Sequence, residues 1–113
     1  MAPKKLEKGQ WQEFFDRVSK VTENKQAEIE VASLSLGDQV QAEWLPLLGL
    51  VYDHKDDLVE VALEGLDHMI RKPRAIYVDI GVGGLATIEI EDGEGSKQLI
   101  RLRDPLMLPP PRR

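Results

Sequence analysis

The chain has 113 residues and a formal net charge of −5, with 42% hydrophobic and 31% charged residues. This length fits one compact domain, and the composition excludes a wholly disordered chain. The acidic balance argues against a nucleic acid as the main partner, because such binding usually needs a concentrated basic face. We therefore expect no nucleic-acid binding. The chain contains no cysteine, which excludes disulfides, thiolate chemistry and cysteine metal ligands.

Both ends of the chain are predicted to lie outside the folded domain. Residues 1–7 carry two neighbouring lysines and are expected to form a flexible basic arm, and residues 105–113 form a Pro-rich tail. Residues 8–104 are predicted to form a single α+β domain. No apolar run approaches the ~18 to 20 residues of a membrane helix, and no apolar segment follows the basic start as in a signal peptide. We expect a cytoplasmic protein without a membrane partner.

One amphipathic helix is predicted near the start of the chain. Trp11, Phe14, Phe15 and Val18 are spaced by three, four and seven residues, which places them on one stripe of a helix. The helix is expected from about residue 9 to residue 21, ending near Asn24. It is too short to be stable alone, so its aromatic stripe is expected to dock on a sheet.

Period-two alternation of apolar residues predicts about six strands in the rest of the chain. The apolar sides of these strands are Ala27, Ile29 and Val31; Val40, Ala42 and Trp44; Val59, Val61 and Leu63; Ile76, Val78 and Ile80; Ala86, Ile88 and Ile90; and Ile100 and Leu102. Residues 47–52 are equally apolar. They either continue the second strand around a bend at Pro46 or form a separate strand, because proline cannot donate to a ladder.

Gly65 and Pro73 enclose a segment long enough for about one or two turns of helix. Consecutive strands joined by short turns favour an antiparallel meander. The expected fold is therefore α+β: an N-terminal helix packed on a curved, mainly antiparallel meander sheet of about six strands, with a short helix between the middle strands. The sheet could stay open or curl into a small barrel, with corners at Pro46, Gly49 or the glycines of residues 81–84.

The last two strands form a hairpin around a glycine-bearing loop at residues 92–96. A register that sets Ile90 opposite Ile100 also sets Glu89 opposite Arg101. Opposite charges across a ladder contribute roughly 0.2 to 1 kcal/mol, which favours this register.

Four segments of the chain resemble those of a known protein family. They are residues 10–16 (QWQEFFD), 45–53 (LPLLGLVYD), 65–73 (GLDHMIRKP) and 100–109 (IRLRDPLMLP). Together they resemble small bacterial proteins of a family of unknown function (domain of unknown function 5335). The resemblance spans nearly the whole chain. It implies a self-contained bacterial domain, and it brings no activity, cofactor or catalytic residue with it.

The strongest candidate for chemistry is the adjacent pair Asp67 and His68. A histidine beside a carboxylate can act as a general base or a metal ligand. Adjacent residues on a helix point about 100° apart, so Asp67 is poorly placed to orient His68 and could instead cap the helix. Together with Tyr52 and Arg71, the pair forms a candidate ligand-binding set at the rim of a pocket between helix and sheet.

No other cluster predicts catalysis, a cofactor or a metal ion. Residues 53–57 offer carboxylates and one imidazole but lack the spacing of a calcium loop. The glycines of residues 81–84 precede a strand, whereas a phosphate loop needs the start of a helix. Ser33, Ser35 and Ser96 lie in no nucleophile-elbow context. We predict no catalytic residue, no cofactor and no metal.

A protein-interaction surface is the leading functional hypothesis. Residues 45–52 are more apolar than one strand face needs, so Leu45, Leu47, Leu48 and Leu50 form a candidate patch. Burial of both faces of this segment beneath the helix is the alternative. We expect a non-enzymatic interaction or regulatory domain that forms a homodimer or binds another protein. The alternative function is a small-ligand-binding domain or minor enzyme with its pocket near His68.

Overall fold

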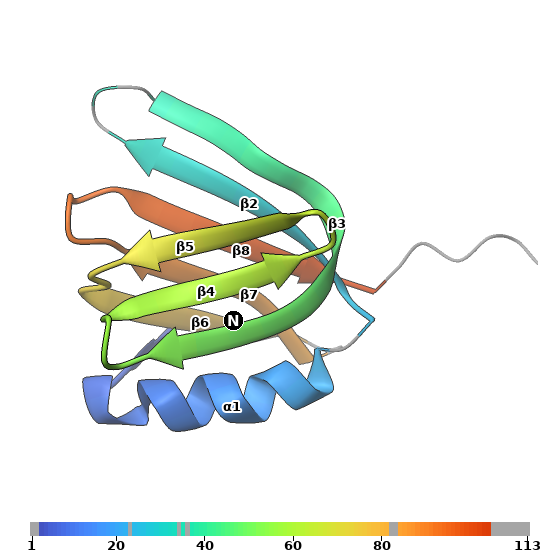
Figure 1. The fold of residues 1–113 in the computed structure, drawn as a ribbon, viewed down its shortest axis with the longest axis horizontal. Helices are drawn as coiled ribbons and strands as arrows, with labels where there is room; N and C mark the ends of the chain where they lie inside the picture. The colour runs from blue at the N-terminus through green and yellow to red at the C-terminus, as the bar shows by residue number, and fades with distance from the viewer. Residues whose placement is uncertain (1–2, 23, 34, 36, 82–83, 105–113) are drawn as a thin grey trace, which may run out of the picture.

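The computed structural model describes residues 3–22, 24–33, 35, 37–81 and 84–104 (Figure 1). The predicted Pro-rich tail lies outside the described residues. The elements, in chain order, are β1 (Lys4–Leu6), a 3-10 turn η1 (Lys8–Gln10), α1 (Trp11–Val21), β2 (Gln26–Ser33), β3 (Gly37–Asp53), β4 (Leu58–Leu63), β5 (Leu66–Arg71), β6 (Ala75–Gly81), β7 (Gly84–Glu91) and β8 (Lys97–Arg103).

Eight antiparallel strands form one sheet in the order β1-β6-β7-β8-β2-β3-β4-β5. The prediction of an α+β fold with an N-terminal helix on an antiparallel sheet is confirmed. Two short meanders, β2 to β5 and β6 to β8, are joined where β2 pairs with β8. The predicted flexible arm contributes β1, since Lys4, Lys5 and Leu6 pair with β6.

The predicted short helix between the middle strands is wrong, because residues 66–71 form the strand β5. Gly65 has a φ of +81° and belongs to a two-residue turn that sets Leu66 opposite Leu63. A positive φ is easy for glycine, so Gly65 closes a hairpin instead of opening a helix. His68 and Ile70 then face the core side, while Met69 between them is exposed on the opposite face.

Strand β3 bends so that the sheet folds over itself (Figure 1). Its first half pairs with β2 and its second half pairs with β4, so residues 47–52 continue the second predicted strand around a bend. Trp44 has a φ of +52°, Pro46 follows it, and the register shifts between Leu47 and Gly49. These irregularities lie where the sequence predicted a corner, because bulges and proline let a strand turn.

Helix α1 covers the open side of the folded sheet beside β3 (Figure 1). Trp11, Phe15 and Val18 are buried and Phe14 packs against the core from its edge, as the predicted stripe requires. One hydrophobic cluster contains residues of α1 and of all eight strands. In the described part of the chain, no helix combines the length and apolar character needed to cross a membrane.

The predicted register of the last hairpin is wrong by two residues. Ile88 lies opposite Ile100, and Ile90 lies opposite Gln98. The observed loop is two residues shorter than the predicted register implies, because Glu91 already pairs with Lys97. Asp92 then leaves the ladder and accepts hydrogen bonds from the loop backbone. The side chain of Arg101 instead binds glutamates of β2.

Candidate functional site: a polar cluster beside the edge strand

A chain of polar side chains joins β5 to the β7–β8 hairpin. Nε2 of His68 lies 2.6 Å from Oε1 of Gln98, and Nε2 of Gln98 donates to Oδ2 of Asp92 at 3.0 Å. Oδ1 of Asp92 accepts the backbone N–H groups of Glu94 at 2.9 Å and Ser96 at 3.0 Å. Asp92 and Gln98 are buried and His68 is half-buried. The carboxylate of Asp92 therefore fixes both the loop and the amide of Gln98.

These bonds determine which nitrogen of His68 carries a proton. A carboxylate oxygen only accepts, so the amide of Gln98 must turn its NH₂ toward Asp92. Its oxygen then faces His68, and Nε2 of that ring must donate to it. In the neutral ring Nδ1 consequently carries no proton and can accept a hydrogen bond. The cluster presents a histidine of fixed orientation on the concave side of the sheet.

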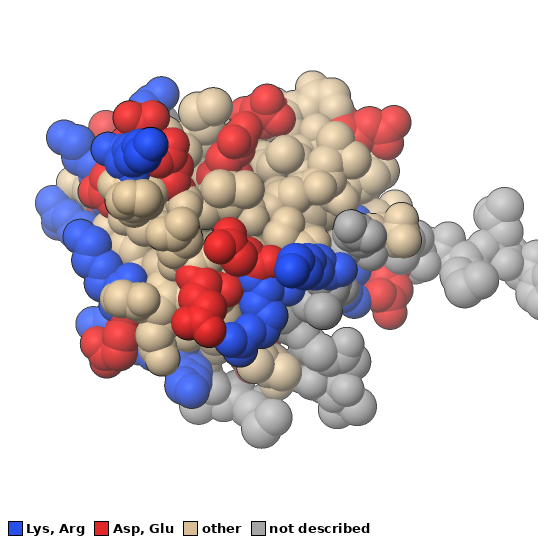
Figure 2. Space-filling view, turned by 60° about the horizontal axis from the view of Figure 1, so that its bottom comes forward, with Lys and Arg blue, Asp and Glu red and all other residues tan. Residues whose placement is uncertain are grey.

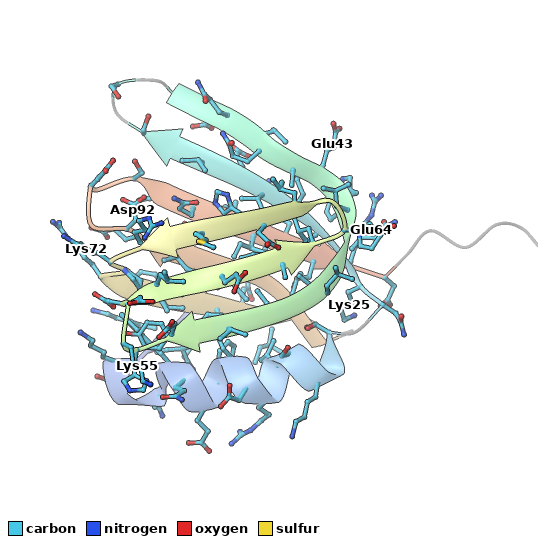
Figure 3. All side chains as sticks on the ribbon, in the orientation of Figure 1. Lys25, Glu43, Lys55, Glu64, Lys72 and Asp92 are labelled. Atoms are coloured by element: carbon cyan, nitrogen blue, oxygen red, sulfur yellow. The ribbon has the colours of Figure 1, made fainter. Side chains whose placement is uncertain are left out.

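Two adjoining hollows lie beside this cluster, and we call them together the amide cleft. The larger, of about 420 Å³, lies between the β2–β3 and β7–β8 hairpins, and the smaller, of about 220 Å³, borders β5. Asp92, Glu94 and Gln98 line both hollows. The larger is also lined by Val31, Ser33, Ser35, Gln39, Gln41, Gly95 and Ser96, and the smaller by Met69 and Arg71. Figure 3 labels Asp92 at the end of the molecule where β5 finishes.

The outer edge of β5 lies beside the smaller hollow. The backbone N–H of Lys72 donates toward β4, to the carbonyl of Asp57, while the carbonyl of Arg71 accepts from Gly93 on the other side. Backbone groups alternate in direction along an antiparallel strand. The N–H and C=O groups of Asp67 and Met69 therefore point away from β4, at the end of the strand order.

The structure places the four predicted ligand-binding residues in different surroundings. His68 faces inward, Asp67 is exposed on the opposite side of β5, and Arg71 is exposed at the smaller hollow. Tyr52 is 7% exposed and lies beside Trp11, with ring centroids 5.4 Å apart. His68 and Arg71 are thus both near the amide cleft, whereas Tyr52 lies under α1.

The buried hydroxyl of Tyr52 donates to Oδ1 of Asp57 at 2.9 Å. Burial raises the pKa of Tyr52 to about 12, and the neighbouring carboxylate of Asp57 adds to the effect because both disfavour the phenolate. This hydroxyl is therefore held neutral as a structural donor.

The predicted apolar patch is divided between core and surface. Leu47 and Leu50 are buried, and Leu45 packs against the core from its edge. Leu48 is 65% exposed. The four side chains do not share one exposed face, because β3 alternates its side chains through the bend.

A second charged group lies on the opposite, outer face of the sheet. Nη1 of Arg101 lies 2.8 Å from Glu28 and 3.0 Å from Glu30. The hydrogen bond between Arg101 and Glu30 lowers the pKa of the Glu30 carboxyl and raises the pKa of the Arg101 guanidinium, because each charge stabilises the other. A hydrogen bond to Glu30 raises the pKa of the Asp38 carboxyl. Three carboxylates thus share one guanidinium, and the group forms a ladder across β8, β2 and β3.

Sequence reasoning missed Gln98, Asp92 and the serines as members of one site. Ser33, Ser35 and Ser96 were excluded as nucleophiles, and they line the amide cleft as hydroxyl groups. A sequence signal existed for Asp92, since an aspartate before glycine at a hairpin often binds its own loop. Among the described residues, no group of three or more carboxylate, imidazole or thiol side chains is arranged to hold a metal ion.

Comparison with known proteins places the chain among uncharacterised bacterial sequences. It is 42% identical over 110 residues to an uncharacterised protein of Aquifex aeolicus (strain VF5), covering 96% of this chain and 99% of the relative. No solved structure gives a significant match. The profile of a family of unknown function, DUF5335, matches residues 2–111. The chain therefore belongs to the DUF5335 family.

Proposed function

We propose that the protein is a non-enzymatic interaction domain that binds an extended polypeptide segment along the outer edge of β5. The supporting observation is the pair of residues Asp67 and Met69, whose backbone N–H and C=O groups point away from β4 beside the amide cleft. An added strand would pair with these groups, which is the usual way for a sheet edge to bind a peptide.

The lining of the amide cleft supports a polypeptide occupant. Its uncharged polar groups include Gln39, Gln41 and Ser96, which can both donate and accept hydrogen bonds. Every second side chain of a strand points to the same face, so alternate side chains of the bound segment would enter the cleft. Exposed Met69 and Leu66 add apolar surface at the edge itself.

The bonding within the polar cluster favours binding over catalysis. The carboxylate of Asp92 already accepts three hydrogen bonds, and the amide of Gln98 is bonded at both ends. A nucleophilic site requires a base in contact with a nucleophile and with an orienting group. The partner of His68 is an amide, which suits a fixed recognition element.

Selection of peptides from a random displayed library would test the proposal. Peptides selected on the protein are expected to lose binding to a Met69→Pro variant, because proline removes the outward N–H without breaking a bond to β4. Met69→Ala is the matched control, since it shortens the side chain and keeps the N–H. Amide NMR spectra of both variants would establish that the fold is retained.

Selected peptides that bind Met69→Pro and the parent protein equally well would refute strand addition. Failure to select any peptide would refute it as well. A second copy of the chain could occupy the same edge and form the expected homodimer. Light scattering after size exclusion would detect such a dimer, and Met69→Pro should then convert it to a monomer.

A small-ligand-binding domain or minor enzyme using the same cleft is the second candidate. It is favoured by the half-buried His68, whose Nδ1 is free of the bond that Nε2 makes to Gln98. Fragment screening by NMR would test it, with hits expected to shift the side-chain amide of Gln98 and to disappear in His68→Phe. Hits that leave both signals unchanged would count against this candidate.

A further inference from the structure

A separate hollow of about 320 Å³ lies between α1 and the β1–β6 end of the sheet. The strand order places it at the opposite end of the sheet from β5, so it is independent of the proposed strand addition. Its apolar wall includes Phe14, Val78 and Ile80, and its charged groups are Lys4, Glu13 and Arg17. We propose that it binds a small amphipathic anion, a carboxylate that carries an apolar chain.

The apolar wall arises because the inner face of β6 extends past the cover of the helix. Ile76 is fully buried and Val78 is 2% exposed, but Ile80, on the same face, is 51% exposed. Burial of an exposed isoleucine side chain is favourable, so this residue offers unused binding surface. Phe14, half-buried on α1, forms the facing wall.

Two cations border this apolar surface. Lys4 lies on the same side of β1 as the buried Leu6, opposite Val78, so its ammonium group is directed toward the hollow and not toward the outer face. Arg17 lines the hollow from α1. Nη2 of Arg17 lies 2.7 Å from Glu13, and both side chains are about three-quarters exposed, 74% and 75%. A guanidinium has five N–H donors, so Arg17 can bind an anion and keep this pair.

The view that brings α1 forward shows basic and acidic side chains interspersed on this face of the molecule (Figure 2). Selection for an anion must therefore come from the two cations at the hollow and not from the overall field, which is acidic. Glu13 is the local competitor for Arg17. Since an exposed ion pair is worth up to about fivefold in affinity, removal of Glu13 should strengthen anion binding by up to that factor.

The volume sets the size of the ligand. At about 30 Å³ for a water-sized group, 320 Å³ holds roughly ten non-hydrogen atoms. Octanoate has this size and is the probe of choice. Octanol, which has the same chain without the charge, and octylammonium, which has the opposite charge, are the matched controls.

Titration of the full chain with octanoate, followed by amide NMR, tests the proposal. Saturable shifts are expected at Phe14 and Ile80, with weaker binding of octanol and octylammonium. A Lys4→Gln, Arg17→Gln variant should bind octanoate about tenfold more weakly, and Glu13→Gln should bind it up to fivefold more tightly. Lys5→Gln is the control on the same strand, because Lys5 lies on the opposite face and is exposed.

Three results would overturn the assignment. If octanol bound as tightly as octanoate, the hollow would be an apolar site without a preference for anions. If octylammonium bound most tightly of the three, the hollow would prefer cations. Equal loss of octanoate binding in Lys5→Gln and in the Lys4→Gln, Arg17→Gln variant would show that net charge, not this site, controls binding. Absence of any saturable shift would also refute the proposal.

Discussion

Ionisation of Tyr52 should couple directly to the stability of the fold at alkaline pH. The pKa of Tyr52 is raised to about 12 by burial and by the hydrogen bond to Asp57, against about 10 for a tyrosine in an unfolded chain. A raised pKa means that the folded state favours the neutral phenol. The resulting stabilisation is fully present below pH ~10 and is lost as the pH rises through about 12.

The two-unit shift corresponds to about 3 kcal/mol, since one pKa unit is about 1.4 kcal/mol. Solvent screens this interaction only in part, because Tyr52 is 7% exposed. The free energy of unfolding of the parent protein, minus that of Tyr52→Phe, should therefore fall by about 2 kcal/mol between pH 10 and 12, with the rest of the ~3 kcal/mol lost just outside this range. Other groups that ionise in this range cancel in the difference.

Absorbance at 295 nm would follow the ionisation itself. The chain has two tyrosines, so Tyr77→Phe leaves the signal of Tyr52 alone. The fold is checked by circular dichroism at each pH. A midpoint near 10 in folded protein would refute the argument that burial and Asp57 keep this hydroxyl neutral, and so would a flat stability difference between the parent and Tyr52→Phe.

Three further changes test the hairpin and the core. Asp92→Ala should cost about 1 to 3 kcal/mol in urea unfolding, because it leaves buried donors unpaired. Gly93→Ala should destabilise the fold, since its Cβ would lie 2.8 Å from Cβ of Lys72, whereas Gly9→Ala meets nothing within 4 Å and should be tolerated. Ile100→Ala should lower the free energy of unfolding by about 2 to 5 kcal/mol, since this side chain is fully buried.

The local elements of the fold were largely readable from the sequence. The stripe of Trp11, Phe15 and Val18 predicted α1, and alternation predicted the strands that became β2, β4 and β6 to β8. Such patterns report which face of an element is buried. The pairing of β2 with β8 was not readable, because it joins segments about 70 residues apart that carry no local signal.

The error at β5 has a definite physical cause. Residues 66–71 alternate between the two faces as a strand does. Only His68 and Ile70 are turned away from solvent, and one of them is polar, so the apolar alternation in the sequence is weak. Gly65 and Pro73 bound either a short helix or a short strand. Burial of Ile70 against Val59 and the turn at Gly65 decide the outcome, and both depend on β4 already being in place.

The candidate site shows why a single residue can be recognised from sequence while its partners cannot. His68 attracts attention because an imidazole is rare and reactive, and the sequence sets it beside Asp67, which was predicted to be poorly placed to orient it. On a strand, adjacent side chains point to opposite faces, so the fold separates the two. The partner is Gln98, 30 residues away, and its orientation is set in turn by Asp92. A glutamine is chemically unremarkable until a carboxylate fixes its amide, and that requires the hairpin loop to be formed first. The properties of His68 that matter for binding, namely its bonded Nε2 and its Nδ1 acceptor, are therefore consequences of the tertiary structure.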